Sequence, residues 1–267
     1  MIRNSQRTIY GLNLTMNMLM GLPHSDLINT TLNEKFNLYP REPIAGGVYP
    51  RVRYLTIGIG GNGVTDNNVY KYSKHRATDA ALFEHTPFIM RPLTSDLTGS
   101  EQLKYRLRVV ENHGGTDYAC YYGKVITDFI NRPSINELHT TNGVTVIKEL
   151  TTNDASILSP TPRLITNYLD KVNNSYTVKT AKVSFNLYND DLTEINNAMI
   201  IRNGVTSNLT EIGIVSGIDA VKNGITELVN ASIYYFAEID VNLQIYLNEN
   251  SDLIKTIELG GMEPILK

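Results

Sequence analysis

The chain has 267 residues, a formal net charge of −3, one cysteine and no tryptophan. A single cysteine excludes an internal disulfide framework, and the slightly acidic balance argues against a general nucleic-acid coat. The start of the chain lacks the apolar core of a signal peptide, and no run of about eighteen apolar residues occurs. We therefore expect a soluble, unprocessed protein that does not enter membranes.

Charge is unevenly distributed along the chain. Residues 1–100 contain 10 Lys and Arg against 7 Asp and Glu, whereas residues 181–267 contain 5 against 12. Uneven solvation explains a mild asymmetry of this kind. The alternative interpretation is that like subunits use the opposite charges in head-to-tail contacts.

The N-terminal segment at 10–22 has an ambiguous pattern. Every even position is apolar or aromatic, which predicts a strand, but a helical stripe is also present. That stripe consists of Ile9, Leu12, Met16, Leu19 and Met20. The Gly, Asn and Thr residues of the segment favour the strand. An extended arm punctuated by Pro and Gly is predicted over 24–49, so residues 1–49 form a strand or helix followed by an arm.

The middle of the chain divides into a regular and an irregular part. Residues 50–130 are predicted to form a β-rich lobe with a strand at 51–59 and a long-turned hairpin at 103–125. Residues 131–177 are interrupted by Thr-Asn, Asn-Gly and Ser-Pro turn signals, which predict an irregular region between lobes.

The last third, 178–267, is predicted to form a second β-rich lobe, although 50–267 can also be one domain. A short helix is expected to start near Asp191 and to end near Gly204. The odd positions of 231–247 are apolar and the even positions mostly polar, which predicts one long strand. Its core-facing side chains should include Tyr235, Ile239 and Leu243. The predicted fold is therefore mainly β, with an antiparallel β-sandwich-like core, an extended N-terminal arm and one or two short helices.

One motif suggests a nucleotide. Residues 58–63 match G-x-G-x-x-G, but a dinucleotide site also needs a helix directly after this loop. The following residues, 64–68, are a poor helix start. We therefore expect a surface loop, or one fitted closely against another backbone, and a nucleotide-binding enzyme is the disfavoured alternative.

Other reactive residues show no catalytic pattern. The five histidines are far apart and lack metal-ligand spacing, and Cys120 lies between tyrosines of the predicted hairpin, as a small buried residue does. We therefore predict no enzymatic activity and no catalytic, cofactor-binding or metal-binding residues.

The order of elements in the last third carries a family resemblance. The passage at 183–200, VSFNLYNDDLTEINNAMI, is followed by EIGIVSGID at 211–219 and by the long strand. With the arm-like loops and the Asn-, Thr- and Tyr-rich composition, this order resembles virion structural proteins of long-tailed, contractile-tail bacteriophages. The resemblance implies a neck, collar, tail-completion or baseplate component that forms a homo-oligomeric ring. It further implies assembly in the host cytoplasm, and as partners other copies of the chain and other tail proteins, without membrane or sequence-specific nucleic acid.

A long strand with an unpaired edge needs cover from a neighbour. We therefore expect interface residues in the Met-rich segment and on the outer face of the long strand. These are Leu12, Leu14, Met16, Met18, Met20, Tyr234 and Phe236. The alternative is a β-sandwich module that binds carbohydrate or a receptor at a fibre tip. Such a module would carry aromatic residues in its loops, whereas most tyrosines here fall in predicted strands.

Overall fold

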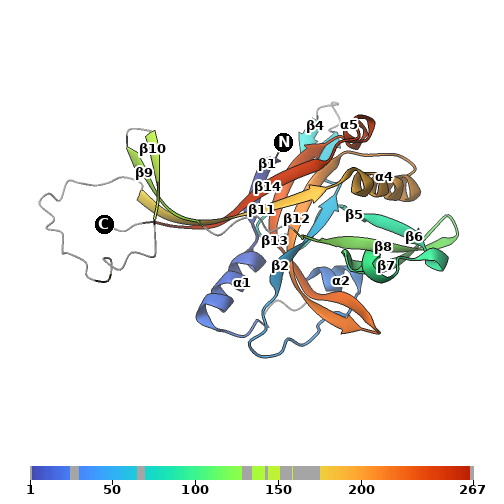
Figure 1. The fold of residues 1–267 in the computed structure, drawn as a ribbon, viewed down its shortest axis with the longest axis horizontal. Helices are drawn as coiled ribbons and strands as arrows, with labels where there is room; N and C mark the ends of the chain where they lie inside the picture. Colours follow the sequence, from blue (N-terminus) through green and yellow to red (C-terminus); the bar gives the residue numbers. More distant parts are fainter. Residues whose placement is uncertain are drawn as a thin grey trace, which may run out of the picture. The chain divides into compact units, whose positions relative to one another are not determined.

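The computed structural model describes residues 2–24, 30–64, 70–127, 134–141, 144–150, 158 and 175–264 (Figure 1). The chain divides into two compact units, Met1–Thr127 with Leu187–Leu253, and Asp128–Asn186 with Ile254–Lys267. This division differs from the predicted lobes, because strands from both halves of the chain share the sheet of the first unit.

The first unit is built on an eight-stranded antiparallel sheet, so the predicted mainly-β fold with a few short helices is confirmed. The order is β1-β13-β12-β2-β8-β6, with β5 paired to β2 and β7 paired to β8. The strands are β1 (Ile2–Arg7), β2 (Arg51–Gly58), β5 (His85–Thr86), β6 (Ile89–Pro92), β7 (Tyr105–His113), β8 (Thr116–Val125), β12 (Leu209–Lys222) and β13 (Ile225–Val241). Strands β7 and β8 are the predicted hairpin, and β2 is the predicted strand after the arm.

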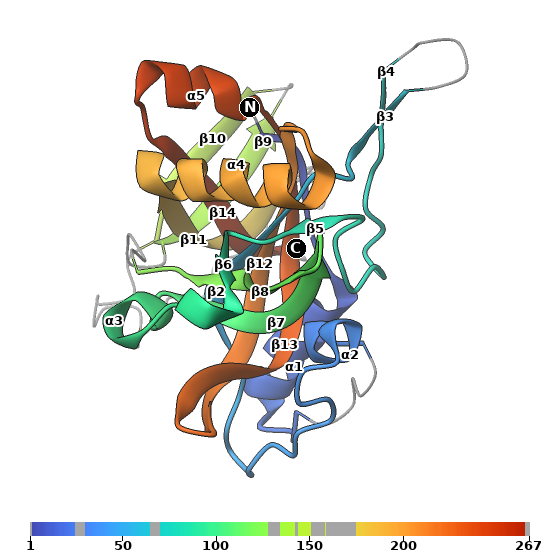
Figure 2. The same cartoon turned by 90° about the vertical axis from the view of Figure 1, so that its right-hand side faces the viewer.

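In the described residues, four further helices and a 3-10 turn accompany this sheet besides the N-terminal helix α1 (Ile9–Met20). They are α2 (Leu32–Phe36), η1 (Leu93–Ser95), α3 (Gly99–Gln102), α4 (Asn189–Asn203) and α5 (Leu243–Glu249). Figure 2 shows α4 and α5 lying side by side. The predicted helix near Asp191 is α4, in which the Asp191 carboxylate accepts the Tyr188 N–H at 3.0 Å and Gly204 forms the left-handed C-terminal cap. No helix in the described ranges is long and apolar enough to cross a membrane.

The longest strand is displaced from its predicted position. Strand β13 ends at Val241, and α5 replaces the remainder of the predicted 231–247 strand. The Asn242 side chain ends the strand because it accepts the Gln244 N–H at 3.0 Å and so caps the helix. Leu243 and Leu247 are spaced i, i+4, so the apolar alternation of this stretch also fits one face of a helix.

A β-bulge decides which side chains of β13 are buried. Ile214 of β12 pairs with Tyr235 and the next residue with Ile233, so Tyr234 is the extra residue. The bulge shifts the alternation, and Phe236 enters the core together with Ile233. The prediction that Tyr235 faces the core is therefore wrong, since its hydroxyl donates to the exposed Ser5 Oγ at 2.9 Å. Burial of the other two predicted core residues of this stretch, Ile239 and Leu243, is confirmed.

The N-terminal segment is a helix, α1 (Ile9–Met20), so the strand interpretation of 10–22 is wrong. Part of the predicted arm is also regular, because α2 lies within it and Leu32 is fully buried. The Asn33 side chain donates to Leu228 O and accepts the Ala231 N–H, both at 2.8 Å. This part of the arm is therefore bound to its own sheet.

The second unit contains a four-stranded sheet with the order β10-β9-β11-β14. Its strands are β9 (Ser134–Thr141), β10 (Val144–Glu149), β11 (Ser175–Leu187) and β14 (Leu253–Pro264). The prediction of an irregular region is therefore wrong for β9 and β10, while 151–157 and 159–174 lie outside the described residues. Every residue of the edge strand β10 is exposed.

Candidate functional site

Helix α1 carries apolar side chains on two opposite faces. Tyr10 and Leu14 point towards the protein and are buried, together with the polar Asn17. The opposite face is also apolar but is exposed to solvent, and we call it the α1 surface. It consists of Ile9, Leu12, Met16, Leu19 and Met20, which are 43–77% exposed. An apolar face of a surface helix is usually covered by the protein core, so this helix has a second apolar face that is not covered by its own protomer.

The helix is held tightly against β13 at the bulge. The Thr8 hydroxyl donates to Ile233 O at 2.5 Å and accepts the Gly11 N–H at 2.9 Å, and the Thr8 N–H donates to Tyr234 O. A Cβ atom at Gly11 would lie 2.4 Å from Tyr234 O, so only glycine permits this approach. Figure 1 shows α1 beside β13 and apart from α4 and α5.

The chemistry of the α1 surface is uniform. No Asp, Glu, Lys or Arg occurs in α1, and three of its residues are methionines. Burying such a surface would remove apolar area from water without the cost of desolvating a charge. Methionine side chains adapt their shape to a partner. The arrangement therefore suits a protein–protein contact.

The structure brings together only part of the predicted interface. Leu12, Met16 and Met20 lie on the α1 surface, and Met18 is exposed beside it near the end of the helix. Leu14 and Phe236 are 2% and 1% exposed, so their assignment to an interface is wrong.

Tyr234 is half-buried against the helix. Its hydroxyl lies 3.1 Å from Thr15 Oγ1, and the Arg7 guanidinium lies 5.7 Å from its ring centre. It therefore supports α1 from within the protomer.

The glycine loop is fitted against neighbouring backbone. A Cβ atom at Gly58 would lie 2.5 Å from Glu84 O, and one at Gly60 would lie 2.7 Å from the Phe83 Cβ. The Gly60 N–H donates to Glu211 Oε1 at 2.6 Å. This backbone donor is therefore already used within the protein and is not available to a phosphate. A strand follows the loop, β3 (Asn62–Val64), and it pairs with β4 (Tyr70–Tyr72). A dinucleotide site needs a helix directly after the glycine loop.

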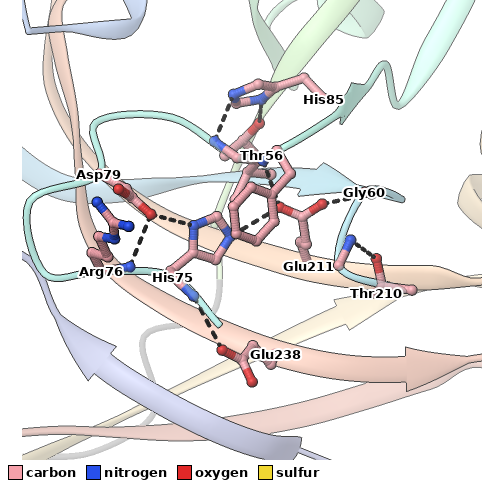
Figure 3. Close-up of polar contacts among 12 residues, drawn as sticks. Thr56, Gly60, His75, Arg76, Asp79, His85, Thr210, Glu211 and Glu238 are labelled. Atoms are coloured by element: carbon pink, nitrogen blue, oxygen red, sulfur yellow. Dashed lines mark hydrogen bonds and ion pairs between the residues drawn. The ribbon is translucent and has the colours of Figure 1, made fainter. Parts of the chain in front are cut away.

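A buried polar cluster lies beside this loop (Figure 3). The His75 ring is stacked between Phe83 and Phe236, with ring centres 4.1 and 4.0 Å away. Its Nε2 lies 2.9 Å from Glu211 Oε2, and its Nδ1 lies 3.3 Å from Asp79 Oδ2. Glu211 Oε2 also accepts the Phe83 N–H at 2.8 Å. The His75 and Glu211 side chains are 2% and 1% exposed, so this cluster fastens the segment 75–84 to β12 and is closed to substrates.

His85 is a second buried histidine near this cluster. Its Nε2 accepts the Leu82 N–H at 3.1 Å, so Nδ1 carries the proton and donates to Thr56 Oγ1 at 2.9 Å. Burial, with smaller contributions from the charges of Lys35, His75 and Arg202, lowers the pKa of His85 to about 3. The imidazole is therefore neutral and structural at neutral pH.

The structure brings together one group of possible metal ligands that the sequence pattern does not predict. Glu111, His113 and Cys120 place their ligand atoms within 4.8 Å of one another in the β7–β8 hairpin. Spacing along the chain does not reveal this group, because the third residue comes from the opposite strand. The strand register of the predicted hairpin would have identified the group, because it pairs Cys120 with Val109 on the face that carries Glu111 and His113.

Residues 2–267 match the model of a family of unknown function, DUF7208, and the chain therefore belongs to that family. No curated protein and no solved structure matches the chain.

Proposed function

We propose that this chain is a non-enzymatic structural subunit that joins copies of itself through the α1 surface, in a homo-oligomeric ring of a bacteriophage virion. The observation that carries the proposal is an uncharged helix with a fully apolar outer face. Monomeric proteins rarely expose contiguous apolar patches of this kind unless a partner covers them.

The polar clusters of the described residues support a structural role. His75 and Glu211 form a closed network with backbone N–H groups, and the neutral His85 is occupied by two hydrogen bonds. A general acid or base must reach the proton that it transfers, and these groups are enclosed by the protein.

The partner that we propose for the α1 surface is a second copy of the chain. The helix belongs to the net positive region 1–100, whereas 181–267 is net negative. Unlike charges favour the approach of unlike regions of two copies, which is the head-to-tail order that a ring requires. Exposed ion pairs contribute only about 0–1 kcal/mol each, so burial of the Leu and Met side chains provides most of the affinity.

The virion as the setting rests on the resemblance of the chain to phage structural proteins. A neck, collar, tail-completion or baseplate subunit acts by positioning its neighbours, and extensive contacts between copies suit that task. Other tail proteins would then contact the assembled ring.

The experiment compares the mass of the purified wild-type protein with that of the double variant Leu12→Asp, Met16→Asp by light scattering after gel filtration. We expect one discrete oligomer for the wild type, unchanged at moderate salt, and a folded monomer for the variant. Two carboxylates in an apolar contact lose their hydration without a partner. The same variant should be absent from virions in a complementation experiment.

The control is Leu103→Asp, which adds a carboxylate at another exposed apolar position of the first unit. It should keep the wild-type mass. A wild-type protein that is monomeric at all concentrations and absent from particles would overturn the proposal. Retention of the wild-type mass by the double variant would also overturn it.

A further inference from the structure

The β7–β8 hairpin brings together three residue types that bind transition metals. Glu111 and His113 lie two residues apart on β7, so their side chains point to the same face of the sheet. Cys120 lies on β8, where it pairs with Val109. Their ligand atoms lie within 4.8 Å of one another, and the His113 Nε2 is 2.9 Å from Glu111 Oε2.

The three side chains differ in their access to solvent. The Glu111 and His113 side chains are 24% and 21% exposed, whereas Cys120 is fully buried. An ion could therefore enter from the side of the carboxylate and imidazole and meet the sulfur at the inner end. Sulfur, imidazole nitrogen and carboxylate oxygen are the donors that zinc uses in proteins, and a thiolate disfavours magnesium and calcium.

We propose that Glu111, His113 and Cys120 form a binding site for a zinc-like divalent cation, with a water molecule as the fourth ligand. Each residue supplies one donor: a carboxylate oxygen, Nε2 and Sγ. Binding replaces the hydrogen bond from His113 Nε2–H to Glu111 with two coordinate bonds. The proton on Nε2 passes to solvent and the neutral ring takes a proton on Nδ1, while the proton of the Cys120 thiol also passes to solvent, so one proton is released in total. The ion would join the two strands of the hairpin.

Neighbouring side chains orient the carboxylate in this site. The Tyr122 hydroxyl donates to Glu111 Oε1, which leaves Oε2 directed at His113. Hydrogen-bond partners of this kind fix the position of a ligand and typically change metal affinity by about 10–100-fold. The Arg202 Nε lies 3.6 Å from Glu111 Oε2. The positive charge of Arg202 repels a bound cation. The negative charges of the Glu111 carboxylate and the Cys120 thiolate together offset this repulsion.

The experiment titrates the metal-stripped full chain with Co²⁺, used in place of spectroscopically silent Zn²⁺. We expect one ion per chain, a thiolate-to-cobalt charge-transfer band in the near ultraviolet, and displacement by Zn²⁺. Cys120→Ser should remove the band, and Glu111→Gln and His113→Gln should each weaken binding at least tenfold. Tyr122→Phe should weaken binding by about 10–100-fold through loss of the hydrogen bond to Glu111.

The matched control is Asp117→Asn, which removes a carboxylate from the same hairpin outside the trio. It should bind Co²⁺ as the wild type does. Absence of the charge-transfer band in the wild type, or retention of that band in Cys120→Ser, would overturn the site. Equal losses in Asp117→Asn and Glu111→Gln would show non-specific binding by carboxylates and would overturn it as well. Circular dichroism of each variant, and a rise in the wild-type melting temperature with Zn²⁺, separate a lost ligand from a lost fold.

Discussion

Two regions that contact β13 reverse the usual distribution of side chains. Around His75, ionisable groups are buried against Phe236, whereas two residues away α1 rests on Tyr234 and turns apolar side chains to solvent. The buried groups are tolerated because each is bonded to a group of the same protomer. The exposed apolar face of α1 has no such cover from its own chain.

We therefore expect the buried cluster around His75 to determine the stability of the protomer, and the α1 surface to determine whether copies associate. Removing a partner from the buried cluster leaves polar groups without water or a substitute, so the folded protomer bears the cost. The α1 surface is already hydrated in the protomer, so a polar substitution there should leave the free energy of unfolding unchanged. The substitution should weaken only the association of copies.

The largest effect on stability is expected for Glu211→Ala. The variant leaves the N–H groups of Gly60 and Phe83 and the Nε2 of His75 without their acceptor. Removing one member of a buried charged network typically costs about 3–5 kcal/mol. Urea unfolding measures the loss. The control Glu249→Ala, at an exposed position of α5, should change the free energy of unfolding by less than about 0.5 kcal/mol.

A smaller loss is expected where the two regions meet, at Gly11→Ala. The added methyl group would lie 2.4 Å from Tyr234 O and would push α1 away from β13. Overpacking of this kind typically costs about 1–3 kcal/mol. Gly46→Ala is the control because its added Cβ meets no atom within 4 Å. Equal unfolding free energies for the two variants would contradict the close contact between helix and strand.

The neutral His85 predicts a dependence of stability on pH. Its pKa is lowered to about 3 in the folded state, so the unfolded chain binds the proton more readily. The contribution of His85 is complete above the unfolded pKa of about 6.5 and declines as the pH falls towards 3, by at most about 1.4 kcal/mol per pH unit. Urea unfolding at pH 7 and pH 5 should show a steeper loss for the wild type than for His85→Gln. Parallel slopes would mean that the His85 pKa is not lowered.

The smallest effect on stability is expected for Leu19→Ser. Leu19 is 77% exposed, so in the isolated protomer the substitution should change the free energy of unfolding by less than about 0.5 kcal/mol. Unfolding is measured under dilute conditions in which the protein is monomeric. A loss above about 1 kcal/mol there would show that Leu19 packs within the protomer, and the contrast between the two regions would disappear.

Local sequence patterns were sufficient for several elements. The strands of the 103–125 hairpin follow from apolar runs around a Gly-Gly turn, and α4 follows from an acidic start and a glycine at its end. These signals act over a few residues, and the final fold did not override them. For the glycine loop, the sequence left open a surface loop or one fitted closely against another backbone, and the structure shows the close fit at Gly58 and Gly60.

Tertiary contacts decided the remaining features. The apolar pattern of 10–22 fits both a strand and a helix, and its Gly, Asn and Thr residues favour the strand. The Thr8 cap and the close approach of Gly11 to Tyr234 decide for the helix. The bulge at Tyr234 exists only relative to the register of β12, so no pattern within β13 reveals that Phe236 is buried. The Glu111, His113 and Cys120 trio likewise depends on which residues of two strands lie together. Side-chain alternation records only that a strand has two faces, and the pairing of strands determines which face each residue occupies.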